Sequence, residues 1–86
     1  MPSTTVTVGS AVGLHARPAT IIAEAATALG TPVTLAADGG DPVDAGSALM
    51  IMTLGAEKGT SITVASDDQA AVDQIAALVA KDLDAE

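Results

Sequence analysis

The chain has 86 residues, 49% of them apolar, and carries 11 acidic against 3 basic side chains, a net charge of −8. This length predicts a single domain over residues 1–86, and the apolar content is too high for a disordered chain. The negative charge and the absence of Phe, Trp and Tyr argue against a nucleic-acid partner, because phosphates are bound by cations and bases stack on aromatic rings.

The first half of the chain predicts a strand, a helix and a β-hairpin. Residues 4–8 alternate polar and apolar, which is typical of a half-buried strand. Helical spacing follows over residues 16–29, and Gly30 marks the end of that helix. Residues 31–37 predict a second strand, joined by the turn "DGGDP" to a weak edge strand at residues 42–45. The side chains expected to face the core are Val6, Val8, Ala19, Ile22, Ala23, Ala26, Leu29, Val33 and Leu35.

The second half predicts a helix, a strand and a last helix. Ser47 is the expected N-cap of a short apolar helix over residues 48–54, and a glycine follows it. Residues 60–66 alternate again as a strand. Ser66 followed by Gln69 matches a capping box, which predicts the start of the last helix. The expected core side chains are Ile62, Val64, Val72, Ile75, Ala76, Val79 and Leu83.

The predicted order is strand, helix, strand, strand, helix, strand, helix. Such a chain buries its apolar faces most simply when the helices lie on one side of an antiparallel sheet. We therefore expect an α+β fold in two layers.

The chain lacks features of secreted or membrane proteins. It contains no Cys, its first ten residues lack the basic start and apolar run of a signal peptide, and "ALMIM" is too short to span a bilayer. We expect a cytoplasmic protein that does not insert into membranes.

The segment "GLHARPAT", residues 13–20, carries the chain's single histidine, His15. One histidine cannot form a metal site, but a neutral imidazole can accept a phosphoryl group covalently. The predicted helix start offers unpaired N–H groups to an anion, Arg17 adds a forked cation, and Pro18 is compatible with a first helical turn. The same helix start and cation should lower the pKa of His15, which leaves the ring uncharged at neutral pH. Because no metal cluster or carboxylate in the motif could activate water, the segment favours a group carrier over a hydrolase.

From spacing alone, simpler interpretations stay open. His15 could cap the helix or fill a boundary position, and Arg17 could be an ordinary surface charge. Ser47 could serve only as a helix cap, and Leu49, Ile51 and Met52 could be core residues.

"GLHARPAT" nevertheless resembles the active-site signature of the HPr family, the histidine-containing phosphocarriers of the sugar phosphotransferase system. The resemblance extends over essentially the whole chain and includes "SALMIMTLG", which is similar to the family's regulatory-serine region. It implies an open-faced β-sandwich of order βαββαβα, with a four-stranded antiparallel sheet and three helices on one face.

The resemblance also implies a function without a cofactor or metal. His15 would take a phosphoryl group from phosphorylated enzyme I, supplied by phosphoenolpyruvate, and pass it to the A domain of a sugar-specific enzyme II. Arg17 would support the transfer. The protein would act as a monomeric phosphoryl carrier and not as an enzyme. Partner docking is expected at the exposed ends of two helices, through Ala16, Thr20, Ala48, Leu49 and Met52.

Ser47 matches the serine that HPr kinase/phosphorylase modifies in some bacteria. The alternative function is therefore an HPr-like regulatory module that acts through phosphorylated Ser47 on a catabolite-control regulator. A plain interaction domain without phosphotransfer is a third hypothesis. The chain departs from the family where many members carry cations near the docking face, because Glu24, Thr27 and Met50 stand at such positions. Electrostatic steering toward acidic partners should therefore be weaker.

Overall fold

The computed structural model describes residues 2–9, 16–37, 40–55 and 57–81. Within these ranges it contains four strands and three helices in the order βαββαβα, which confirms the predicted order. Observed and predicted boundaries of the first six elements differ by at most two residues. The elements are β1 (Ser3–Thr7), α1 (Ala16–Leu29), β2 (Val33–Ala37), β3 (Val43–Asp44), α2 (Ala48–Thr53), β4 (Ser61–Ser66) and α3 (Gln69–Ala80).

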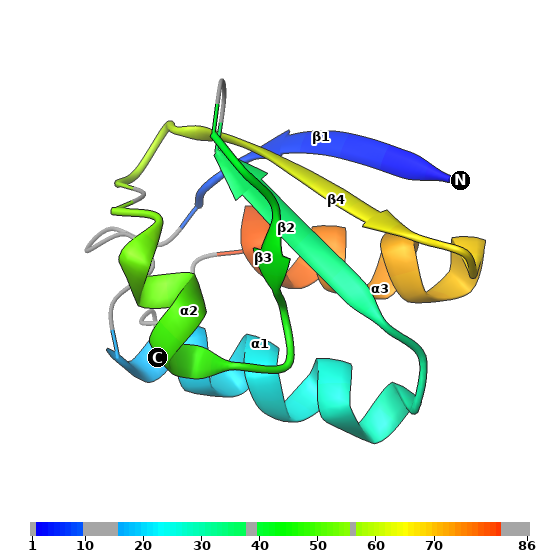
Figure 1. Ribbon diagram of the computed structural model, residues 1–86. Helices are drawn as coiled ribbons and strands as arrows, with labels where there is room; N and C mark the ends of the chain where they lie inside the picture. The colour runs from blue at the N-terminus through cyan, green and yellow to red at the C-terminus, as the bar shows by residue number, and fades with distance from the viewer. Residues whose placement is uncertain (1, 10–15, 38–39, 56, 82–86) are drawn as a thin grey trace.

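The four strands form one antiparallel sheet in the order β1-β4-β2-β3 (Figure 1). Strand β4 lies between β1 and β2, so that Val64 faces Thr4 on one side and Leu35 on the other. Strand β3 has two residues and forms one edge, as predicted for the segment after Pro42. A proline without an N–H is tolerated beside an edge strand because no ladder hydrogen bond is lost.

The sheet has one covered and one open face. Alternate residues of β4 (Ile62, Val64 and Ser66) are buried, and α1 and α3 lie on the same side of the sheet (Figure 1). The open face is lined by small side chains, most of which carry a hydroxyl, and the hydroxyls of Thr5 and Thr63 lie 3.1 Å apart across β1 and β4. The fold is the predicted open-faced sandwich, in which period-two strands present their apolar side to the helices.

The core is built from aliphatic side chains. Alanines on α1 and α3 allow these helices to approach each other and the sheet closely, while Ile and Val supply most of the buried volume. Its fully buried large residues include Ile22, Leu35, Ile51, Ile62, Val64, Val72, Ile75 and Val79.

The start of α3 differs from the sequence prediction. Ser66 does not cap the helix: it is the last residue of β4, it is fully buried, and its hydroxyl donates to the Pro32 carbonyl at 2.7 Å. Asp68 is the N-cap instead, and its carboxylate accepts the Ala70 N–H at 3.0 Å. The predicted capping box is therefore wrong, because a tertiary hydrogen bond to the β2 side of the sheet takes the serine that local spacing assigned to the helix.

Replacing Ser66 with Ala is expected to lower the free energy of unfolding by about 1–3 kcal/mol, because buried polar groups lose their partner. The hydroxyl also accepts the Asp68 N–H at 3.3 Å, so the variant leaves a carbonyl and an N–H without this oxygen. Urea unfolding followed by circular dichroism measures the effect. Ser61→Ala, at the half-buried start of the same strand, is the control; an equal loss in both variants would contradict the role given to the Ser66 hydrogen bonds.

Candidate functional site

The first turn of α1 exposes the residues that follow His15. Ala16 and Arg17 are exposed, whereas Pro18 is buried against the core side of the helix. Proline fits here because the first turn has no internal acceptor for its missing N–H. His15 lies outside the described residues, so the predicted orientation of its ring toward the helix N–H groups stays a prediction.

Ser47 is the N-cap of α2, as predicted. Ser47 has an extended backbone and its Oγ accepts the Met50 N–H at 3.3 Å. A tight turn precedes it, in which the Asp44 carboxylate accepts the Gly46 N–H at 2.8 Å. Ser47 itself is half-buried. Its hydrogen bond to the Met50 N–H establishes its role as a helix cap, whereas its regulatory role stays a prediction.

The short α2 buries little of its apolar sequence. Ile51 is fully buried, whereas Leu49 is 69% exposed, Met50 42% and Met52 37%. The simpler interpretation is therefore confirmed for Ile51, which is a core residue, and wrong for Leu49 and Met52, which are exposed. Exposed neighbouring apolar side chains of this kind are typical of a protein-interaction surface.

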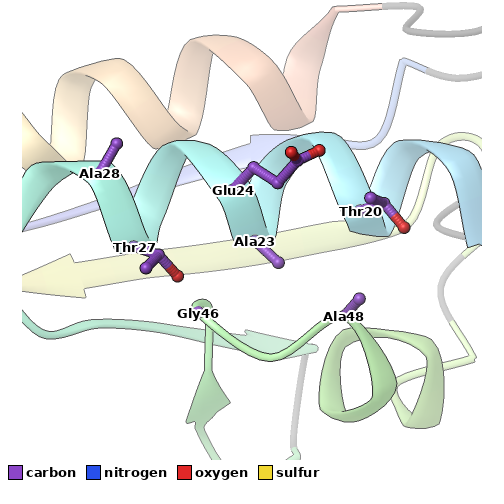
Figure 2. A pocket seen from close by; sticks show the side chains of 7 residues that line it. All are labelled: Thr20, Ala23, Glu24, Thr27, Ala28, Gly46 and Ala48. Atoms are coloured by element: carbon purple, nitrogen blue, oxygen red, sulfur yellow. The ribbon is translucent and has the colours of Figure 1, made fainter.

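Helices α1 and α2 pack against each other, and a groove of about 530 Å³ lies between them (Figure 2). It brings together Thr20 of α1, which is exposed, and Ala48 of α2, which is half-buried. The Thr20 hydroxyl donates to the Ala16 carbonyl at 2.7 Å. Residues from both predicted docking segments thus share one surface. The groove is lined by Thr20, Ala23, Glu24, Thr27, Ala28, Gly46 and Ala48.

A second depression of about 260 Å³ continues this groove along α1. The two share Thr27 and Gly46, and the second reaches Asp44 and the segment between α1 and β2. The sequence did not indicate Gly46 or Asp44 as site residues, because their place beside α1 is set by the packing of the β3–α2 turn.

Within the described part of the chain, no three His, Asp or Glu side chains come together to hold a metal ion. The helices in that part are also too short or too polar to cross a bilayer.

The fold and this surface together define a class of protein. It is a small two-layer α+β protein whose first helix starts beside an apolar surface on a second, shorter helix. The comparisons with known proteins then place the chain within that class.

The profile of a family described as "PTS HPr component phosphorylation site" matches residues 2–81. The chain belongs to this family, the HPr components of the phosphotransferase system. A curated relative, phosphocarrier protein HPr of Streptomyces coelicolor, is 58% identical over 52 residues. That match spans 60% of this chain and 56% of the relative, just over half of the length of each.

Solved structures agree with the fold. HPr-C-His from Thermoanaerobacter tengcongensis superposes with a TM-score of 0.87 at 26% identity, over 100% of this chain and 99% of that one. The HPr of Bacillus anthracis superposes with a TM-score of 0.81 at 32% identity, over 91% and 95% of the two chains. The resemblance and the fold class predicted from the sequence are both confirmed.

Proposed function

We propose that this protein is a phosphocarrier: His15 accepts a phosphoryl group from phosphorylated enzyme I and passes it to the A domain of a sugar-specific enzyme II. A bond from phosphorus to a ring nitrogen of His15 forms as the bond to the donor breaks, and the second transfer reverses this on the next acceptor. The observation that carries the proposal is the family match over residues 2–81, which includes "GLHARPAT" and therefore His15 and Arg17.

Arg17 is proposed to support the transfer. It is exposed in the first turn of α1 and lies two residues after His15 in the sequence. A guanidinium can bind two phosphate oxygens at once, and its charge disfavours imidazolium in the unloaded protein. The pKa of His15 is therefore expected below that of an unstructured histidine peptide, which an NMR titration of the ring can check.

Partner docking is proposed on the α1–α2 surface, through the exposed Ala16, Thr20, Leu49 and Met52 and the half-buried Ala48. Unbranched methionines adapt to surfaces of different shape, which suits a carrier that must bind a donor and an acceptor in turn. We also propose that the protein is a monomer, since a second copy bound on the α1–α2 surface would block both the donor and the acceptor. One domain over residues 1–86, acting in the cytoplasm without a cofactor, metal or nucleic acid, completes the proposal.

The test of this function is incubation with enzyme I and phosphoenolpyruvate labelled in its phosphoryl group. The expected product carries label that is lost in acid and stable in base, as for phosphohistidine. Unlabelled protein under conditions that label a known HPr would overturn the phosphocarrier and leave an interaction domain without phosphotransfer.

A regulatory module acting through Ser47 is the second proposed function. Ser47 lies at the start of α2, beside the exposed Leu49 and Met50, and its Oγ is already placed at the helix N–H groups. A phosphate on this oxygen would add about two negative charges next to the docking surface. HPr kinase/phosphorylase would add the group, and a catabolite-control regulator would bind the product.

Replacing Ser47 with Asp is expected to slow phosphoryl transfer from enzyme I more than Ser47→Ala does. Asp keeps an acceptor for the Met50 N–H and adds a charge, whereas Ala removes the cap at about 1 kcal/mol of stability. Initial rates of labelling measure the first effect and thermal unfolding the second. Equal transfer rates for Asp and Ala would contradict a charge-based switch at this position.

A further inference from the structure

The helices of the α1–α2 surface carry one positive and one negative side chain, which lie apart along the same side of α1. The sequences of α1 and α2 contain two charged residues, Arg17 and Glu24. They are seven residues apart, which on a helix is about two turns and about 10 Å, so both lie on one side of α1. The surface therefore has a positive end next to the His15 segment and a negative end farther along the helix.

Glu24 stands over the groove. It lines the groove with Thr20 and Thr27 on its own helix and Ala48 on α2, and its side chain is exposed. Figure 2 shows this side chain extending along α1 toward Thr20, which is the end nearer to Arg17. A partner that fills the groove would meet this carboxylate and remove part of its water.

The other described residues of the groove offer Glu24 no compensating cation. Among the described residues that line the groove and its continuation, the charged ones are Glu24 and Asp44, both acidic. Asp44 already accepts the Gly46 N–H and lies in the continuation near the far end of α1. A carboxylate that is partly desolvated without a partner costs free energy, so a bound face must supply a positive group to it.

From this we infer that Glu24 determines partner specificity: the cognate enzyme I docks with an apolar side chain on the α1–α2 groove and a Lys or Arg opposite Glu24. This inference rests on the proposed phosphocarrier function and concerns the same surface. Glu24 is a docking residue and touches no reacting atom. Its replacement should therefore change KM and the salt dependence of transfer, with kcat nearly unchanged.

The experiment measures phosphoryl transfer from the enzyme I of the same organism to the wild-type chain and to Glu24→Gln, Glu24→Lys and Asp67→Lys. Asp67→Lys is the matched control, because it changes the net charge equally at an exposed site between β4 and α3. At low salt we expect kcat/KM to fall about threefold for Glu24→Gln and about tenfold for Glu24→Lys, against less than about twofold for the control. Added salt should shrink these differences. Thermal unfolding should be unchanged in the two Glu24 variants, whereas Asp67→Lys places a cation one residue before Asp68, the N-cap of α3, and should lower the Tm slightly.

The outcomes separate the two proposals. Wild-type labelling combined with a Glu24→Lys rate that equals or exceeds the Asp67→Lys rate would overturn the role of Glu24 and leave the phosphocarrier intact. A Glu24→Lys defect that appears in kcat alone would also overturn it, since docking acts through KM. Failure of enzyme I to label the wild-type chain would overturn the phosphocarrier and this inference together.

Discussion

His15→Ala is expected to abolish acid-labile labelling by enzyme I and phosphoenolpyruvate, to below about 1% of the wild-type level. His15 is the chain's single imidazole, and there is no cysteine to act as another nucleophile. Ser47 and the other hydroxyls could carry a phosphate ester, but such esters survive acid. Autoradiography of the protein after parallel acid and base treatment measures the result.

Two further variants make this result specific. Ser47→Ala should still incorporate acid-labile label, because the hydroxyl it loses caps α2 and the proposed acceptor, His15, is unchanged. Arg17→Ala should be labelled about 10- to 100-fold more slowly, since the forked donor set is lost while the acceptor nitrogen remains. Label that persists in His15→Ala would move the phosphorylated residue elsewhere. Normal labelling of Arg17→Ala would remove the support role assigned to the guanidinium.

The elements of this fold could be predicted because local patterns and tertiary packing agree at most positions. Period-two alternation in β4 and period-3.6 spacing in α1 and α3 each place their apolar side chains in the one core. Ser66 is the exception: its sequence context satisfies a local capping rule, but the Pro32 carbonyl on the neighbouring segment takes its hydroxyl. A bond between residues 34 positions apart leaves no trace in local spacing.

The site was predictable only as separate segments. "GLHARPAT" indicates anion chemistry by its residue types, and "SALMIM" indicates a capped apolar helix. Spacing could not tell which apolar residues of α2 are buried, because a helix of six residues has too few turns to define a face; the structure buries Ile51 and exposes Leu49. The groove itself is formed where Gly46 and Ala48 come opposite Ala23 and Thr27 of α1, an arrangement set by how α1 and α2 pack.

A second large effect is expected on stability at Gly9, which precedes the His15 segment. The Gly9 N–H donates to the Val79 carbonyl at 3.1 Å, so the end of β1 lies directly against the end of α3. A Cβ at this position would stand 1.9 Å from the Ala80 carbonyl oxygen and 2.7 Å from its carbon. Both are backbone atoms, which cannot turn away as a flexible side chain can. Local sequence patterns do not indicate this contact, because it joins segments near opposite ends of the chain.

Gly9→Ala is therefore expected to lower the free energy of unfolding by about 3 kcal/mol, the upper end for an overpacked site, because β1 and α3 must separate. Gly30→Ala is the matched control: its Cβ would meet nothing within 4 Å, but its φ of +69° is unfavourable for alanine, at a cost of about 1 kcal/mol. Urea unfolding measures the loss in the free energy of unfolding for each variant, and the difference between the two losses separates the effect of the steric clash at Gly9 from the effect of an unfavourable backbone angle at Gly30. A Gly9→Ala loss no greater than that of Gly30→Ala would mean that the ends of β1 and α3 do not meet as closely as described. A larger loss at Gly9 would mean that the contact between the segment after β1 and the end of α3, made six residues before His15, depends on the absence of a single methyl group.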